Sequence, residues 1–192
     1  MSNYVMSDVH GQYKSYMKML KKIDLKTDDT LYVLGDAIDR GPDGIKILAD
    51  IMKRPNVVMI LGNHEMLMMD ALKNFDEIKS KDRHDTDDID LWLDPCNGGE
   101  STYEEYTKLS ASKRKAILDY LENAWIIKKI KINNKTYHLS HFYYTIIISI
   151  DLSIIVILST SISNTTSSFS WPAYSTVTTP HPKSTLEYFL IP

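Results

Sequence analysis

The sequence has very little cysteine, and this excludes a disulfide-stabilised fold. Cys96 is the single cysteine among 192 residues, so no disulfide can form within the chain, and this usage is typical of a reducing compartment. The first residues, MSNYVMSDVHG, lack the basic and then apolar segments of a secretory signal peptide. We therefore expect a cytoplasmic protein.

The sequence also lacks a basic surplus and a convincing membrane span. Its formal net charge is −3, whereas proteins that bind nucleic acids usually carry excess lysine and arginine. The most membrane-like stretch, residues 142–158, is slightly short, is interrupted by Asp151 and has no flanking basic residues. We expect neither nucleic acid nor a membrane as a partner.

Short apolar runs alternate with segments of helical periodicity in the first 141 residues. The runs predict strands at residues 4–6, 31–34 and 57–61. Helices are predicted after them at residues 12–23, 44–54 and 65–75. No hairpin signal separates these strands, so the pattern predicts βαβ units and a largely parallel sheet. The expected fold class is therefore α/β, within a domain that covers residues 1–141.

Two other regions differ from this alternation. Residues 80–125 are predicted to be a helical insert, with a helix at residues 112–123 for which Ser112 is the N-cap. Residues 142–192 form a tail rich in Ser, Thr and Ile, in which Asp151 is the only formal charge before Lys183. Helix caps and turn glycines are missing there, so the tail does not continue the preceding pattern.

Polar residues of the metal-ligand type follow the predicted strands. They are Asp8 and His10 after the first strand, Asp36 after the second, and Asn63 and His64 after the third. A fourth strand at residues 135–141 would bring His141 to the same edge, because ligands gather at the carboxyl ends of strands in open α/β sheets. Oxygen and imidazole donors without a thiolate suit manganese, iron or zinc.

Three motifs in this order resemble a known family. S-D-V-H-G at residues 7–11, G-D-A-I-D-R-G at 35–41 and G-N-H-E at 62–65 are similar to the signature of the calcineurin-like metallophosphoesterases. The full motifs resemble its phosphoprotein phosphatase branch, which includes bacterial Ser/Thr protein phosphatases and symmetrical diadenosine tetraphosphatases. Trp92, the N-G-G at residues 97–99 and Thr102 also resemble an element of the bacterial members. The resemblance implies a sandwich of central β-sheets flanked by helices.

The resemblance also implies a dinuclear metal centre, with manganese as the first expectation and iron or zinc as alternatives. Asp8 and His10 would hold one ion, Asp36 would bridge both ions, and Asn63 and His141 would hold the second. A hydroxide that bridges the two ions would attack the phosphorus.

The same resemblance gives roles in catalysis to three further residues. His64 would be the general acid that protonates the leaving oxygen, and Asp39 would orient its imidazole. Arg40 would bind the phosphoryl oxygens, as planar guanidinium groups commonly do. Arg40, Asn63 and His64 are therefore the expected substrate-binding residues.

The sequence departs from the family after His141. A small residue and a glycine should follow this histidine, but Phe142 and Tyr143 stand there. No arginine occurs after Arg114 to bind the phosphate from the C-terminal half, and His181 is a weak candidate for the last metal histidine because prolines flank it. A reading-frame shift just after codon 141 would explain all three departures. Translation of the other two frames beyond that codon would test this hypothesis, which fails if they encode no Gly-His-Thr and no arginine.

The sequence thus predicts a phosphomonoesterase, with phosphorylated proteins as the first expected substrates and small phosphoesters as others. Symmetrical hydrolysis of dinucleoside tetraphosphates is the alternative within the same chemistry. A truncated or frame-damaged relic without catalysis is the alternative from another class.

Overall fold

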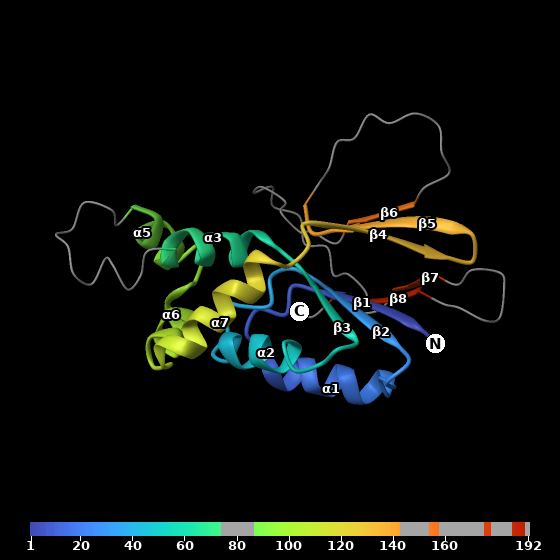
Figure 1. Ribbon diagram of the computed structural model, residues 1–192, viewed down its shortest axis with the longest axis horizontal. Coiled ribbons are helices and arrows are strands. Elements are labelled where there is room, and N and C mark those ends of the chain that lie inside the picture. Colours follow the sequence, from blue (N-terminus) through green and yellow to red (C-terminus); the bar gives the residue numbers. More distant parts are fainter. Residues whose placement is uncertain (74–86, 143–153, 158–174, 178–185, 191–192) are drawn as a thin grey trace, which may run out of the picture.

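The computed structural model describes residues 1–73, 87–142, 154–157, 175–177 and 186–190 of the chain (Figure 1). Within these residues, no helix is both long and apolar enough to cross a membrane.

The main sheet has five strands in the order β3-β2-β1-β8-β7. They are β1 (Asn3–Ser7), β2 (Thr30–Leu34), β3 (Val57–Ile60), β8 (Leu186–Leu190) and β7 (Ser175–Val177). The first four strands in this order run parallel, and β7 pairs antiparallel with β8. The largely parallel α/β sheet expected from the sequence is confirmed.

A second sheet has three strands in the order β4-β5-β6. They are β4 (Ile127–Ile132), β5 (Lys135–Ser140) and β6 (Ile154–Ile157). The hairpin between β4 and β5 turns at Asn133 and Asn134, which have φ angles of 49° and 60°. Two consecutive left-handed residues are typical of a type I′ hairpin turn. The sequence analysis missed β4, although this Asn-Asn pair was a signal for the hairpin.

The described helices are α1 (Tyr13–Ile23), α2 (Gly44–Ile51), α3 (Asn63–Leu72), α5 (Asp87–Leu93), α6 (Glu100–Thr107) and α7 (Ala111–Glu122). The predicted N-cap of α7 was wrong, because the helix begins at Ala111 after Ser110. Ser110 has the extended backbone of an N-cap, with a ψ angle of 153°, whereas Ser112 lies inside the first turn.

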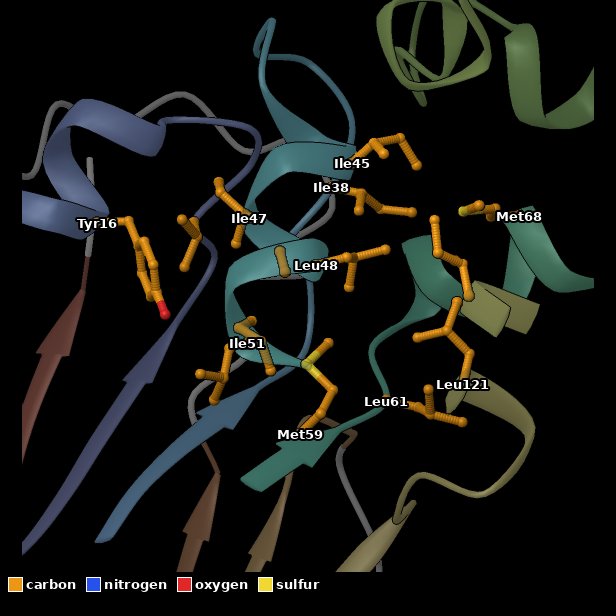
Figure 2. Close-up of a cluster of buried hydrophobic side chains, with 14 of the residues drawn as sticks. Tyr16, Ile38, Ile45, Ile47, Leu48, Ile51, Met59, Leu61, Met68 and Leu121 are labelled. Atoms are coloured by element: carbon orange, nitrogen blue, oxygen red, sulfur yellow. The ribbon is translucent and has the colours of Figure 1, made fainter. Parts of the chain in front are cut away.

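Two hydrophobic cores lie on the two faces of the main sheet. The larger core packs the sheet against the helices and includes Tyr16, Leu48, Ile51 and Met59 (Figure 2). The smaller core packs Val5, Tyr32, Leu34 and Ile60 of the main sheet against Ile132, Tyr137 and Leu139 of the second sheet. Figure 1 shows α1 and α2 below the main sheet and β4–β6 above it. This layering brings the ends of β1, β2, β3 and β5 to one site.

Candidate metal centre and active site

All five predicted metal ligands lie in one cluster at the ends of these strands. Asp8 follows β1, Asp36 comes two residues after β2, Asn63 begins α3 after β3, and His141 follows β5. His10 Nε2 lies 4.0 Å from Asp8 Oδ1, and His141 Nε2 lies 3.1 Å from Asn63 Oδ1. Asp36 and His141, which are 105 positions apart in sequence, thus meet through the two sheets.

The carboxylate of Asp36 lies at the centre of this cluster. Its Oδ2 is 3.7 Å from His10 Nε2 and 3.4 Å from His141 Nε2. His10 and His141 are predicted ligands of different ions, and one carboxylate oxygen lies between them. The position of Asp36 therefore suits a bridging ligand.

The hydrogen bonds of the two histidines fit a metal. Nδ1 of His10 lies 3.1 Å from the carbonyl oxygen of Ile38, and Nδ1 of His141 lies 2.9 Å from that of Leu34. A carbonyl oxygen only accepts, so in both rings Nδ1 carries the proton, and in the neutral ring Nε2 carries the lone pair. At His141 this lone pair faces the acceptor oxygens of Asn63 and Asp36. Acceptor atoms that face one another in this way are stabilised by a cation between them. A hydrogen bond from Nδ1 to a backbone carbonyl oxygen is also typical of a histidine that binds a metal through Nε2.

Five residues of the site hold left-handed backbone conformations that non-glycine residues rarely adopt. The φ angles are 55° at Asp8, 43° at His10, 54° at Asp36, 66° at Asp39 and 64° at Arg40. Such conformations cost about 1–3 kcal/mol each and persist where the surrounding structure imposes them, commonly at functional sites. They turn the chain sharply after β1 and β2, so that neighbouring polar side chains face one centre.

His64 and Asp39 form a buried pair beside the metal cluster. His64 Nδ1 lies 2.8 Å from Asp39 Oδ2, and the two side chains are 1% and 0% exposed. Burial lowers the pKa of His64, but the hydrogen bond that its ring donates to Asp39 and the charge of Asp36 outweigh it, so the pKa lies above its usual value. The ring therefore favours its protonated form, with Nε2 directed toward Asp36 at 4.0 Å.

The described residues also include a second combination of possible ligands. His10, Asp36 and His64 can each place one ligand atom within 4.8 Å of the others. A protonated imidazole cannot coordinate a metal. The raised pKa of His64 therefore favours a role in proton transfer over one as a ligand.

Arg40 lies at the exposed side of the same cluster. Its Nη1 is 2.8 Å from His10 Nε2, to which it donates a hydrogen bond. Burial and the charge of Arg40 lower the pKa of His10, so this imidazole favours its neutral form, and a metal bound at Nε2 would take the place of the Arg40 hydrogen bond. The guanidinium group thus lies where a phosphoryl group bound at the cluster would meet a cation.

Sequence reasoning gave no role to Glu65, although it is the last residue of the G-N-H-E motif. Its carboxylate is fully buried and accepts hydrogen bonds from the backbone of Asp36, Ala37 and Gly62, at 2.8, 2.8 and 2.9 Å. Burial and the charge of Asp36 raise the pKa of Glu65 to about 7, against the effect of the three N–H donors. Glu65 is the third residue of α3 and accepts the N–H of the N-cap Gly62, which is one half of a capping box, since glycine has no side chain to return the bond.

Two sequence-based expectations involve residues outside the described part of the chain. His181, the weak candidate for the last metal histidine, lies there, as does Tyr143. The described neighbour of His141 is Phe142, whose ring stands edge-on to the imidazole with centroids 5.5 Å apart.

A family model described as calcineurin-like phosphoesterase matches residues 1–145 of the chain. A metallophosphoesterase of Sphaerobacter thermophilus is 20% identical, with a TM-score of 0.42 over 70% of this chain and 45% of that one. A structural similarity of this size is too low to bear on function.

Curated relatives match part of the chain at higher identity. A symmetrical bis(5'-nucleosyl)-tetraphosphatase of Wigglesworthia glossinidia brevipalpis is 36% identical over 85 residues, or 43% of this chain and 31% of that protein. A protein of the same name from Photorhabdus laumondii is 33% identical over 102 residues, or 48% of this chain and 37% of that protein. The chain thus matches about a third of the length of these relatives.

Proposed function

The chain belongs to the calcineurin-like phosphoesterases, and from this membership we propose that it hydrolyses dinucleoside tetraphosphates at a two-metal centre. The main support for metal-dependent hydrolysis is that His10 and His141 both lie close to Asp36 Oδ2. The names of the curated relatives favour the dinucleotide substrate over the phosphoprotein that the sequence analysis put first.

The proposed centre assigns Asp8 and His10 to one ion, Asn63 and His141 to the other, and Asp36 to both. When bound, two divalent ions neutralise phosphoryl oxygens and lower the pKa of the attacking water. Carboxylate, amide and imidazole donors without thiolate favour manganese, with iron or zinc as alternatives.

The remaining proposed steps belong to His64, Asp39 and Arg40. Arg40 orients the phosphoryl group through its guanidinium fork. Asp39 accepts the Nδ1 proton of His64 and thereby fixes the ring, so that a proton on Nε2 faces the cluster. His64 gives this proton to the leaving oxygen as its bond to phosphorus breaks.

Mn²⁺ is expected to stabilise the native chain, and Asp36→Asn to remove most of that effect. At a hundredfold excess over the dissociation constant, a ligand of the native state adds about 2.7 kcal/mol to the free energy of unfolding. The thermal midpoint with and without Mn²⁺, together with metal content after dialysis, measures the effect. Asp43→Asn is the matched control, because Asp43 pairs with Lys46 outside the cluster. Equal metal content in wild type and Asp36→Asn would contradict the proposed centre.

The substrate is tested with the manganese-loaded chain and two compounds, diadenosine tetraphosphate and a phosphoserine peptide. Symmetrical cleavage yields ADP alone, asymmetrical cleavage yields AMP and ATP, and the peptide yields inorganic phosphate. Release of phosphate from the peptide, without ADP from the dinucleotide, would favour the phosphoprotein phosphatase. No turnover of either compound would reject the proposed function and support the relic without catalysis.

An exposed aromatic residue beside β3 supports a nucleotide substrate. Trp125 is 51% exposed, its carbonyl oxygen accepts the N–H of Leu61 at 2.7 Å, and Leu61 lies two residues before Asn63. Lys128 Nζ lies 3.8 Å from the centroid of the Trp125 ring. An aromatic face next to a cation is the chemistry that stacks a nucleobase and attracts a phosphate.

Trp125→Ala is expected to raise the KM for diadenosine tetraphosphate about tenfold, because base stacking contributes about 1–3 kcal/mol. The KM for p-nitrophenyl phosphate, which carries no base, should stay unchanged. Trp125→Phe, which keeps an aromatic face, should retain most of the dinucleotide affinity. A similar rise in KM for both substrates would contradict the stacking role.

A further inference from the structure

Residues 92–102 contact the backbone and side chain of the Asp39–Arg40 pair at three points. Trp92 Nε1 donates to Asp39 Oδ2 at 2.9 Å, and Asp39 N donates to Thr102 Oγ1 at 2.9 Å. Arg40 N donates to the carbonyl oxygen of Gly98 at 2.8 Å. This segment runs from the end of α5 into α6, and the sequence motifs assigned it no chemistry. We call residues 92–102 the brace.

The brace contacts two consecutive residues in the left-handed backbone region. Asp39 and Arg40 are consecutive non-glycine residues with φ angles of 66° and 64°. Each left-handed residue costs about 1–3 kcal/mol and is kept only when its surroundings impose it. The bonds that the two N–H groups of this pair donate to Thr102 and Gly98 hold the groups in place and so stabilise the left-handed conformation directly.

The two glycines of the brace permit its close approach. A Cβ atom on Gly98 would lie 3.0 Å from Arg40 Cγ, and Gly98 itself has a φ angle of 71°. A Cβ atom on Gly99 would lie 2.5 Å from the carbonyl oxygen of Trp92. Neither position accepts a side chain without displacing Arg40 or Trp92, which explains the Gly-Gly pair in physical terms.

Trp92 also completes the environment of the Asp39 carboxylate. Oδ2 of Asp39 accepts from both Trp92 Nε1 and His64 Nδ1, whereas Oδ1 is buried without a hydrogen-bond partner among the described residues. Both donors therefore act on one oxygen of a fully buried group. Without the indole N–H, His64 would be the only donor left, and the orientation of the carboxylate would be less defined.

We propose that Trp92 is a positioning residue for proton transfer, and that the brace holds Asp39 and Arg40 in their working conformations. Trp92 acts through Asp39 on His64 and touches no substrate. This proposal rests on the proposed hydrolysis at the two-metal centre. It adds that the helical insert, through Trp92, helps to position the proton donor.

Trp92→Phe tests the proposal, because phenylalanine keeps an aromatic ring and removes the N–H. Its kcat is measured on aryl phosphates whose leaving groups range from p-nitrophenol to phenol. If His64 is misplaced in this variant, the reaction suffers most when the leaving oxygen must be protonated. Phenolate is a more basic leaving group than p-nitrophenolate, so kcat should fall about 10- to 100-fold for phenyl phosphate. It should fall little for p-nitrophenyl phosphate, with KM unchanged for both.

Ile117→Ala is the matched control for lost packing, since Ile117 is buried in the same core as Trp92 but lies on α7, outside residues 92–102. This change should lower the thermal midpoint and leave the dependence of kcat on the leaving group as in wild type. An equal fall of kcat on all aryl phosphates in Trp92→Phe would overturn the positioning role.

A second measurement does not depend on turnover. In the ¹⁵N-labelled chain, the indole N–H of Trp92 should exchange with solvent at least tenfold more slowly than that of the exposed Trp125. Asp39→Asn should shift the Trp92 resonance and leave that of Trp125 in place. If the chain hydrolyses neither diadenosine tetraphosphate nor an aryl phosphate, the proposed function fails while this measurement still decides the contact. Rapid exchange at Trp92 would overturn the brace itself.

Discussion

Replacing His64 by asparagine is expected to reduce kcat for an alkyl phosphate by about 10²–10⁴-fold, the usual contribution of a general acid. His64 is 1% exposed, its Nδ1 is fixed by Asp39 at 2.8 Å, and its raised pKa favours the protonated form. A leaving alkoxide is strongly basic and needs that proton. The loss should shrink with leaving groups that depart as stable anions, such as p-nitrophenolate.

Metal content separates this role from coordination. His10, Asp36 and His64 lie close enough to share an ion, so loss of metal from His64→Asn would mean that His64 is a ligand. We expect this variant to retain both ions and Asp36→Asn to lose them. His138→Asn is the control, because His138 lies on β5 outside the cluster and should keep full kcat. Undiminished hydrolysis of an alkyl phosphate by His64→Asn would contradict the assignment as acid.

Local periodicity predicted the parallel part of the fold because each βαβ unit is encoded by contiguous sequence. It did not predict that residues 135–140 pair with β4 in a second sheet, since that pairing depends on a two-residue turn and on tertiary packing. The pairing of β8 with β1 joins residues at opposite ends of the chain. No local pattern encodes such a contact, and the tail around it lacks regular periodicity.

The strand-end motifs led to the candidate site because each motif places polar side chains directly after an apolar strand. The bridging position of Asp36 between His10 and His141 came from the family resemblance and not from local spacing, because that geometry depends on how the two sheets pack. Local sequence also carried no sign of the buried contact between Trp92 and Asp39. Residues 53 positions apart form this bond, and an indole in a helical insert is most simply expected in the core.

Glu65→Gln is expected to lower the free energy of unfolding by about 3 kcal/mol, because each buried N–H left without an acceptor costs about 1–3 kcal/mol. The carboxylate accepts three backbone N–H groups from the turns after β2 and β3. An amide replaces one accepting oxygen by an NH₂ group, which repels the N–H that faces it. Glu65→Ala removes all three acceptors, and we expect it to leave much of the chain unfolded, since domains of this size are stable by only about 5–15 kcal/mol.

Urea denaturation at pH 7 measures the loss, and Glu105→Gln is its matched control. Glu105 accepts one backbone N–H, from Ile45 at 2.9 Å, and is half-buried, so its change should cost about 1 kcal/mol or less. If Glu65→Gln is no less stable than Glu105→Gln, then Glu65 does not hold the two turns together. A large loss would instead show that the turns bearing Asp36 and Asn63 are joined through Glu65, so that one buried carboxylate supports the geometry from which the proposed metal centre is built.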